Sequence, residues 1–347
     1  MGGRIIVRQT NWIGDAVMTM PALELLRKAH QDDQIWIAAR PWVAPVFEAL
    51  PWLKGTIPLI QARGLQKVSL LAEQASSIRK GRFDLGVVFP NSFESALLFF
   101  LARIPQRAGY ASDMRRLLLT RPFPVPDDKK RRHEVFYYLN LVSRLTGMPV
   151  PERPRIRLAV ARKGRQGADR ILSETGLSSG APLIGFNPGA AYGPAKCWPE
   201  ERWVELGKAL CRRFHGCRIA ILGTDRERES FAFMAEKIGS GAVSLAGRTS
   251  LSEAMGVIDR LDILITNDSG LMHIGAGLGT PLVAIFGSTN PVTTGPWSDR
   301  AVVVRHELPC SPCLKRTCPE DFECMKAISA DEVSSAAESL LERGRTE

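Results

Sequence analysis

Three polar segments of the sequence each follow an apolar, strand-like run and carry residue types suited to phosphate or proton chemistry. The first ends in Gly14 and Asp15, the second is residues 187–199 with Lys196, and the third is residues 266–270. A carboxylate can accept a proton, a lysine can neutralise a diphosphate, and a helix start can bind a phosphate. Together these segments indicate a site for a phosphorylated ligand.

Asp15 lies where a helix is expected to begin, and a carboxylate at a helix N-terminus is favoured in its charged form. It would be ionised at neutral pH and able to accept a proton. The alternative is a first-turn acid that only stabilises the helix. The position of Asp15 after the first expected strand favours a role in a ligand site.

The segment Thr-Asn-Asp-Ser-Gly at 266–270 lies between an expected strand and an expected helix. Asp268 or Ser269 can cap that helix, and its free N–H groups would attract a phosphate. Helix capping alone is the alternative interpretation. Ser288 and Thr289 follow the next strand and would add hydroxyl groups at the same sheet edge.

Lys196 lies in a long loop that also contains Gly189 and Gly193 and follows another strand of the same sheet. A lysine there could neutralise a diphosphate. A solvated surface lysine is the alternative.

Strand and helix patterns alternate along the whole chain. In the first half we expect strands at 4–8, 35–39 and 85–89, and helices at 15–29, 95–102, 131–146 and 165–175. In the second half we expect strands at 183–186, 218–222, 263–266 and 282–286, and helices at 203–214, 227–237, 251–259, 271–278 and 329–343. This alternation predicts an α/β fold with doubly wound parallel sheets covered on both faces. Ligands of such sheets bind at the carboxyl ends of the strands.

The length of 347 residues exceeds what one hydrophobic core usually holds, so two domains are expected. The polar linker near residues 176–182 suggests a first domain at 1–176, a second at 177–328 and a terminal helix at 329–347. A cleft between the two sheets would then hold the ligand.

The composition indicates an ordinary globular protein, with 45% hydrophobic and 24% charged residues. The longest strongly apolar run, Ala96–Ala102, is far too short to span a bilayer. The N-terminus lacks the pattern of a signal peptide, and Met1-Gly2 is not followed by the Ser or Thr of a myristoylation site. We therefore expect a cytoplasmic protein.

The chain is basic, with 46 Lys and Arg against 36 Asp and Glu and a net charge of +10. This excess favours anionic partners without choosing among nucleic acid, phosphorylated small molecules and an acidic membrane face. A basic cluster in the first half consists of Arg115, Arg116 and residues 129–132. Aromatic residues are not interleaved with it, which disfavours nucleic acid. Solvated surface charge is the alternative.

The seven cysteines include four within 15 residues, at Cys310, Cys313, Cys318 and Cys324. Cys-x2-Cys is a metal-ligand spacing, but the gaps of four and five residues are irregular. A structural metal and a loop of reduced thiols both remain open.

Several familiar motifs are missing: the Walker A loop, HExxH and the Asp-x-Asp pair that holds a divalent cation in many sugar-nucleotide enzymes. The glycines at 275–279 close a helix, so they are not a dinucleotide fingerprint. The Gly-x-Ser-x-Gly match at 176–180 enters a strand instead of leaving one, so it is not a nucleophile elbow.

In combination, these segments resemble the ADP-heptose:lipopolysaccharide heptosyltransferases. Residues 11–15 with Pro21 resemble the Gly-Asp-x5-Pro signature of that family, and 187–199 resembles its nucleotide-side loop. Residues 267–270, with His273 and the segment up to Pro281, resemble its diphosphate loop. Similarity to the second-acting members in particular comes from residues 91–93, 109–110 and 310–324.

The resemblance implies a GT-B fold, in which two Rossmann-like domains face each other across a cleft. It implies transfer of L-glycero-D-manno-heptose from ADP-heptose to the first heptose of the lipopolysaccharide inner core, with inversion at the anomeric carbon. The partners would be ADP-heptose and the acceptor heptosyl-Kdo-lipid A, with peripheral contact at the inner face of the inner membrane and no nucleic acid.

The resemblance also assigns roles to residues. Asp15 matches the general base, and Lys196 matches the residue that stabilises the departing ADP. Residues expected to bind ADP-heptose are Asp268, Ser269, Gly270, Leu271, His273 and Ser288. Residues expected to bind the acceptor are Arg115, Arg116, Lys130 and Arg131. No catalytic metal is expected, because Lys196 and the helix dipole would neutralise the diphosphate.

One departure from the family pattern lies just before Lys196. The hydroxyl residues of the first-acting enzymes are replaced here by Ala190, Ala191 and Tyr192, which favours a second-acting enzyme. The alternatives are a first- or later-acting heptosyltransferase and a GT-B sugar-nucleotide epimerase. A non-catalytic nucleotide-binding or nucleic-acid-binding protein is the alternative from a different class.

Overall fold

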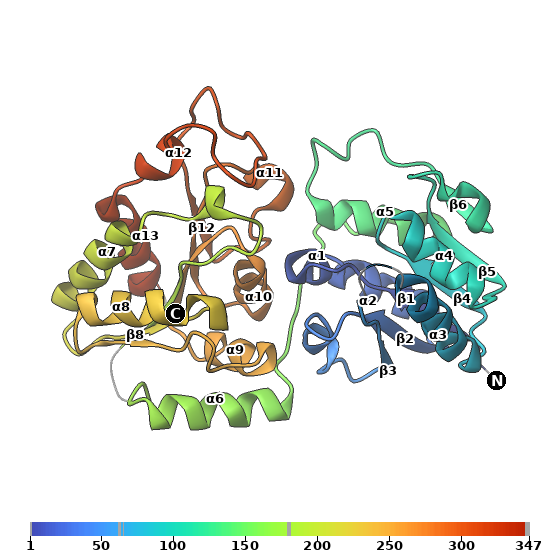
Figure 1. The fold of residues 1–347 in the computed structure, drawn as a ribbon, viewed down its shortest axis with the longest axis horizontal. Helices are drawn as coiled ribbons and strands as arrows, with labels where there is room; N and C mark the ends of the chain where they lie inside the picture. Colours follow the sequence, from blue (N-terminus) through green and yellow to red (C-terminus); the bar gives the residue numbers. More distant parts are fainter. Residues whose placement is uncertain (1, 62–63, 65, 179–181, 344–347) are drawn as a thin grey trace. The chain divides into compact units, whose positions relative to one another are not determined.

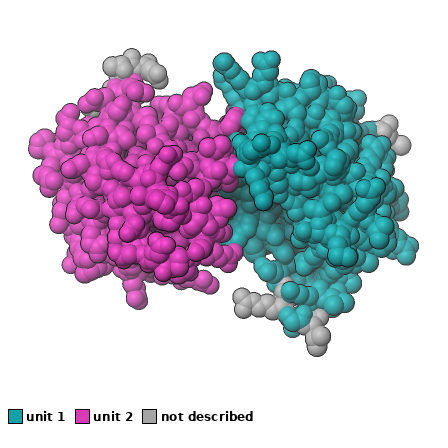
Figure 2. Space-filling model, turned by 90° about the horizontal axis from the view of Figure 1, so that it is seen from above, with its two compact units in different colours: residues 1–155 teal, residues 156–347 magenta. Residues whose placement is uncertain are grey.

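The computed structural model describes residues 2–61, 64, 66–178 and 182–343. The chain divides into two compact units, Met1–Arg155 and Ile156–Glu347 (Figure 2). Each unit is built on a six-stranded sheet in which every neighbouring pair of strands is parallel. The expected α/β architecture of two doubly wound sheets is therefore confirmed.

The first unit has the strand order β3-β2-β1-β4-β5-β6 (Figure 1). Its strands are β1 (Arg4–Arg8), β2 (Gln34–Ala39), β3 (Leu53–Pro58), β4 (Leu85–Val88), β5 (Gln106–Tyr110) and β6 (Arg121–Phe123). Its helices are α1 (Ile13–Met18), α2 (Met20–Ala29), α3 (Gln66–Lys80), α4 (Phe93–Leu101) and α5 (Glu134–Thr146), with 3-10 turns η1 (Ala44–Phe47) and η2 (Arg115–Leu118).

The second unit has the strand order β12-β11-β10-β7-β8-β9. Its strands are β7 (Leu183–Asn187), β8 (Arg218–Ile221), β9 (Ala242–Ser244), β10 (Ile263–Asn267), β11 (Leu282–Ile285) and β12 (Ala301–Val304). Its helices are α6 (Arg162–Glu174), α7 (Glu200–Arg213), α8 (Arg228–Ile238), α9 (Leu251–Ile258), α10 (Gly270–Leu278), α11 (Pro291–Thr294), α12 (Glu323–Lys326) and α13 (Ala330–Arg343), with 3-10 turns η3 (Pro194–Lys196) and η4 (Asp225–Glu227).

The central strands are buried on both faces, as their apolar sequences predict. Every residue of β4, β7, β10 and β11 is buried. Burying aliphatic side chains on both faces of a parallel sheet supplies the main stabilisation of such a layer. Because both faces of the sheet are covered, a ligand can reach it only at the loops that follow the carboxyl ends of these strands.

The helix expected at 15–29 is divided in two at Thr19. Pro21 has no N–H group to donate to the carbonyl of Val17, so a continuous helix cannot form there. The Thr19 hydroxyl instead donates to the carbonyl oxygen of Ala16 at 2.7 Å. Asp15 consequently lies in a short helix of its own, ahead of α2.

The domain boundary expected at 176/177 is corrected to 155/156. The reason is that α6 packs along α9 of the second unit (Figure 1). The backbones of these helices approach closely: a Cβ atom on Gly164 would lie 2.4 Å from the carbonyl oxygen of Ser252. The terminal helix α13 likewise packs on α7 and belongs to the second unit.

Within the described ranges, the structure has no helix that is both long and apolar enough to cross a membrane.

Candidate active site

The loops after β7, β10 and β11 form a polar site at the carboxyl edge of the second sheet. These strands are neighbours, and their registers pair Thr266 with Asn187 and Asn267 with Ile285. The ends of the strands therefore lie side by side, and the loops that follow them meet. This is the edge at which parallel sheets bind ligands.

An ion pair joins the lysine and the aspartate that the sequence singled out. The Lys196 ammonium lies 2.6 Å from Oδ2 of Asp268, and their side chains are 13% and 5% exposed. The Thr289 hydroxyl donates to the same carboxylate oxygen at 2.6 Å. The structure thus brings Lys196 together with the segment at 266–270, although 72 residues separate the two in the chain.

Two asparagine side chains connect the loops around this ion pair. The amide of Asn187 donates to the hydroxyls of Thr266 and Ser269, each at 2.7 Å. The amide of Asn267 donates to the carbonyl of Pro188 and accepts from the backbone N–H of Trp198 at 3.3 Å. These bonds fix the positions of the Lys196 loop and of the start of α10 relative to each other.

The helix start expected at Ser269 is present. Ser269 is the N-cap residue of α10, and its hydroxyl accepts from the backbone N–H of Met272 at 3.4 Å. Gly270 and Leu271 form the first turn, where backbone N–H groups have no partner within a helix. His273 follows in the next turn and is 4% exposed. The local geometry suits a phosphate group.

The loop that carries Lys196 is held by the segment after β12. The hydroxyl of Tyr192 donates to the carbonyl of Leu314 at 2.8 Å, and the N–H of Ala195 donates to the carbonyl of Arg316 at 3.1 Å. Gly193 has a φ of 155°, and a Cβ atom there would lie 2.3 Å from the carbonyl oxygen of Arg316. Only glycine fits this close approach, so the loop that positions Lys196 depends on it.

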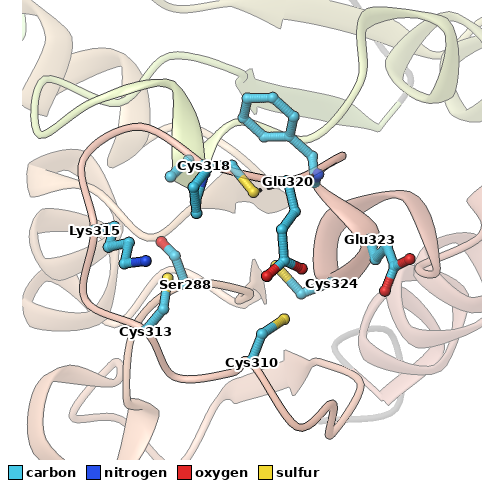
Figure 3. A pocket seen from close by; sticks show the side chains of 11 residues that line it. Ser288, Cys310, Cys313, Lys315, Cys318, Glu320, Glu323 and Cys324 are labelled. Carbon is cyan, nitrogen blue, oxygen red and sulfur yellow. Dashed lines mark hydrogen bonds between the residues drawn. The ribbon is translucent and has the colours of Figure 1, made fainter.

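Ser288, expected from the resemblance to bind ADP-heptose, forms no hydrogen bond with the ion pair of Lys196 and Asp268 among the described residues. It is 2% exposed, and it lines a cavity of about 40 Å³, where its hydroxyl has no hydrogen-bond partner within the described ranges. The neighbouring Thr289 takes the place next to Asp268 instead. The same cavity is lined by Cys310, Cys313, Cys318 and Cys324 (Figure 3).

The four cysteines thus all line one small cavity. Burial, together with the three neighbouring thiols, raises the pKa of Cys324. Within the described part of the chain, no three Cys, His, Asp or Glu side chains are placed as the ligands of a metal ion. A metal would require the sulfur atoms to move together.

A structural metal at these thiols stays a prediction. If it is present, protein purified under reducing conditions without chelators should contain about one metal ion per chain, and removing the metal should lower the melting temperature. Metal analysis by mass spectrometry, before and after dialysis against a chelator, measures this. A metal content near zero retires the metal interpretation and leaves reduced thiols.

Asp15 lies in the first unit, half-buried in the first turn of α1. Helix α1 packs against α5, whose first residue is Glu134. Burial and, to a smaller extent, the Asp15 carboxylate raise the pKa of Glu134 to about 7, while Lys129 opposes the shift. A second carboxyl group therefore lies in the electrostatic neighbourhood of Asp15. No pattern in the sequence had singled out Glu134.

The pKa of Glu134 predicts a pH dependence of stability. The folded protein keeps this proton up to about pH 7, whereas an unfolded glutamate loses it near pH 4.5. Because the folded state binds more protons between these values, stability falls as the pH rises from about 4.5 to 7. Glu134→Gln should reduce that fall, measured as the difference in melting temperature between pH 5 and pH 8. The exposed Glu48→Gln serves as the control, and an equal fall in both variants contradicts the prediction.

Arg115 is a correction to the expected acceptor site. Its side chain is fully buried, and its guanidinium donates to the carbonyls of Tyr110 and Pro90 and to the Ser95 hydroxyl. Burial lowers its pKa to about 10. Arg115 therefore holds loops of the first unit together and does not present its charge to a ligand. The sequence placed it in a run of basic residues and could not show which one turns inward.

The other expected acceptor residues, Arg116, Lys130 and Arg131, are exposed on the first unit. The neighbouring Lys129 is instead directed to α5, where its ammonium lies 4.4 Å from the ring centre of Tyr137. These three side chains remain available to an anionic partner.

Comparison with known proteins shows the family to which the chain belongs. The model of glycosyltransferase family 9 (heptosyltransferase) matches residues 72–323. Lipopolysaccharide heptosyltransferase 2 of Salmonella typhimurium is 32% identical over 312 residues, which cover 87% of this chain and 88% of that protein.

Two solved structures are similar over nearly the whole chain. The E. coli ADP-heptose lps heptosyltransferase II has a TM-score of 0.82 and 28% identity, with 99% of each chain covered. A glycosyl transferase of family 9 from Veillonella parvula has a TM-score of 0.85 and 27% identity, covering 98% of this chain and 97% of that one.

Proposed function

Because the chain belongs to glycosyltransferase family 9, the heptosyltransferases, we propose that it transfers a heptose from ADP-heptose to the first heptose of the lipopolysaccharide inner core. The observation that carries this proposal is the buried cluster of Lys196, Asp268 and Thr289 at the start of α10. We infer that it is a preformed site for the charged part of a nucleotide diphosphate. Several relatives that match 87% of the chain carry the name heptosyltransferase 2, which supports the second step.

The donor half of the mechanism concerns the leaving group. As the bond between the anomeric carbon and the diphosphate oxygen breaks, negative charge grows on that oxygen. Lys196 and the backbone N–H groups at Gly270 and Leu271 would stabilise this charge. Asp268 holds the Lys196 ammonium at 2.6 Å, and the Thr289 hydroxyl donates to the same Asp268 oxygen at 2.6 Å and so fixes that carboxylate. The ammonium is therefore positioned before the reaction begins.

The acceptor half concerns the attacking hydroxyl. The Asp15 carboxylate would take the proton of the acceptor hydroxyl as its oxygen bonds to the anomeric carbon. Attack on the face opposite to the departing ADP inverts the configuration at that carbon. The products are the extended glycolipid and ADP, with the proton left on Asp15 until solvent removes it.

The acceptor is an anionic glycolipid, and the exposed Arg116, Lys130 and Arg131 would attract it. The same positive charge would favour peripheral contact with the cytoplasmic face of the inner membrane. His273, buried in α10, would line the donor site from its second turn.

The proposal is tested by incubating the protein with ADP-heptose and inner-core acceptors truncated after zero, one or two heptoses. Mass analysis should show the gain of one heptose on the acceptor that carries a single heptose. Extension only of the acceptor without heptose, or only of longer ones, would assign the enzyme to another step. Epimerisation of the donor without any transfer would favour the epimerase alternative.

A further inference from the structure

The first unit contains a groove of about 800 Å³. None of the residues proposed above to bind the donor or the acceptor lines it. It lies at the carboxyl ends of β1, β2 and β3, between helices α3 and α4. Its volume is within the range of pockets that hold a small-molecule or sugar-sized ligand. Its position next to β1 and β4, where the strand order reverses direction, is the usual ligand position in such sheets.

The floor of this groove carries two arginines that share one neutral acceptor. Nη2 of Arg8 donates to Oδ1 of Asn11 at 2.8 Å, and Nε of Arg40 donates to the same oxygen at 3.4 Å. Arg40 also donates to the carbonyls of Leu59 and Ile60, at 3.1 and 2.6 Å. Hydrogen bonds therefore fix both guanidinium groups in place.

Within the described residues, one exposed carboxylate, that of Glu94, forms an ion pair with one of the two arginines, so the charge of the pair is only partly balanced. Arg8 is only 4% exposed, and among the described residues its Nε has no hydrogen-bond partner and no carboxylate forms an ion pair with it. The Glu94 carboxylate forms its ion pair with Arg40 at 4.0 Å, and its side chain is 62% exposed. Burial and the charge of Arg40 lower the pKa of Arg8 to about 9. Burying like charges together is costly unless an anion pairs with them.

The walls of the groove would strengthen an ion pair formed on its floor. They are largely aliphatic and come from both helices: Leu70 and Leu71 from α3, and Leu97, Leu98 and Leu101 from α4. Apolar walls lower the local dielectric, so a bound anion would be attracted more strongly here than at the exposed cluster.

We propose that this groove is an anion subsite for the acceptor, in which Arg8 and Arg40 bind a carboxylate or phosphate group of the glycolipid. The inference rests on the proposed function, because it assigns the groove to the acceptor of that reaction. The groove would bind one anionic group in a defined orientation, whereas the exposed cluster of Arg116, Lys130 and Arg131 would attract any anion. A planar guanidinium pair with preset hydrogen bonds recognises the shape of the anion as well as its charge.

The test compares Arg8→Met and Arg40→Met with Arg79→Met, which removes an exposed arginine of α3 outside the groove. Removing a charged hydrogen-bonding group should raise the KM for the acceptor by about 10- to 100-fold. The KM for ADP-heptose should change by less than about twofold, and Arg40→Lys should recover part of the loss. Arg79→Met should have the same KM values for the acceptor and for ADP-heptose as the wild-type protein.

Two further arms keep the test decisive. Binding of the acceptor to Asp15→Asn protein, with and without Arg40→Met, is measured by calorimetry, so a defect in turnover cannot imitate a defect in binding. Melting temperatures identify a variant that is merely misfolded, in which case the Arg40→Lys result decides. Acceptors that are dephosphorylated or carboxyl-reduced show which anion is bound, because only loss of the bound group should cancel the effect of Arg40→Met.

The outcomes separate this inference from the proposed function. If the unchanged protein transfers no heptose, the proposed function fails. If it transfers heptose while Arg8→Met and Arg40→Met keep the acceptor KM and affinity within twofold, the function stands and the groove is not the anion subsite.

Discussion

Asp15→Asn is expected to lower kcat for heptosyl transfer by about 10²- to 10⁴-fold, the usual contribution of a general base. Asparagine keeps nearly the same shape and cannot take the proton of the attacking hydroxyl. ADP should bind with an unchanged dissociation constant, because the residues that we propose to bind it lie on the loops after β7, β10 and β11 and not in α1. Steady-state kinetics and calorimetry with ADP measure the two quantities.

A matched control for this variant is Asp32→Asn, the same chemical change at an exposed position of the first unit. It should leave kcat unaltered. If Asp15→Asn retains turnover within a few fold of the unchanged protein, Asp15 is a first-turn acid and another group accepts the proton. Glu134, whose carboxyl group lies in the same electrostatic neighbourhood, would then be the next candidate to test.

The sequence was most informative where burial leaves a continuous apolar run. The strands expected at 4–8, 85–89 and 263–266 correspond to β1, β4 and β10. The edge strand β3 was missed because Pro51 precedes it, Pro58 ends it and its burial is only partial. An edge strand tolerates proline, so its pattern is weaker than that of a central strand.

The donor side of the site was also predictable in outline. Lys196 and Asp268 follow two strands of one parallel sheet, and strands of such a sheet end at the same edge. The sequence could not show that Thr289 instead of Ser288 would face Asp268. Successive residues after β11 point in different directions, and only the packing of the cysteine segment decides which one turns inward.

The acceptor side was the least predictable part. Arg115 counted as one of several adjacent basic residues, yet the 3-10 turn η2 directs it into the core. Arg8 and Arg40 are 32 residues apart in sequence, and they meet because β1 and β2 are neighbouring parallel strands in register. The number of charged residues in the sequence predicts neither the burial of Arg115 nor the proximity of Arg8 and Arg40. Both depend on the direction in which each side chain leaves its loop or strand.

Lys196→Met is expected to lower kcat by about 10²- to 10³-fold, the usual cost of removing one preorganised group that stabilises developing charge. Methionine keeps the unbranched stem and removes the ammonium that lies 2.6 Å from Asp268. It also leaves the carboxylate of Asp268, which is 5% exposed, without its cation. Loss of one partner of a buried ion pair is strongly destabilising, so the melting temperature should fall as well.

The double variant Lys196→Met with Asp268→Asn separates the two effects. Because asparagine removes the uncompensated charge, stability should recover in the double variant, whereas kcat should remain low. The exposed Lys208→Met of α7 is the control for loss of a lysine and should change neither quantity. If kcat recovers together with the melting temperature, Lys196 acts only by holding the loop, and the charge on the departing ADP is stabilised by the start of α10 and other groups.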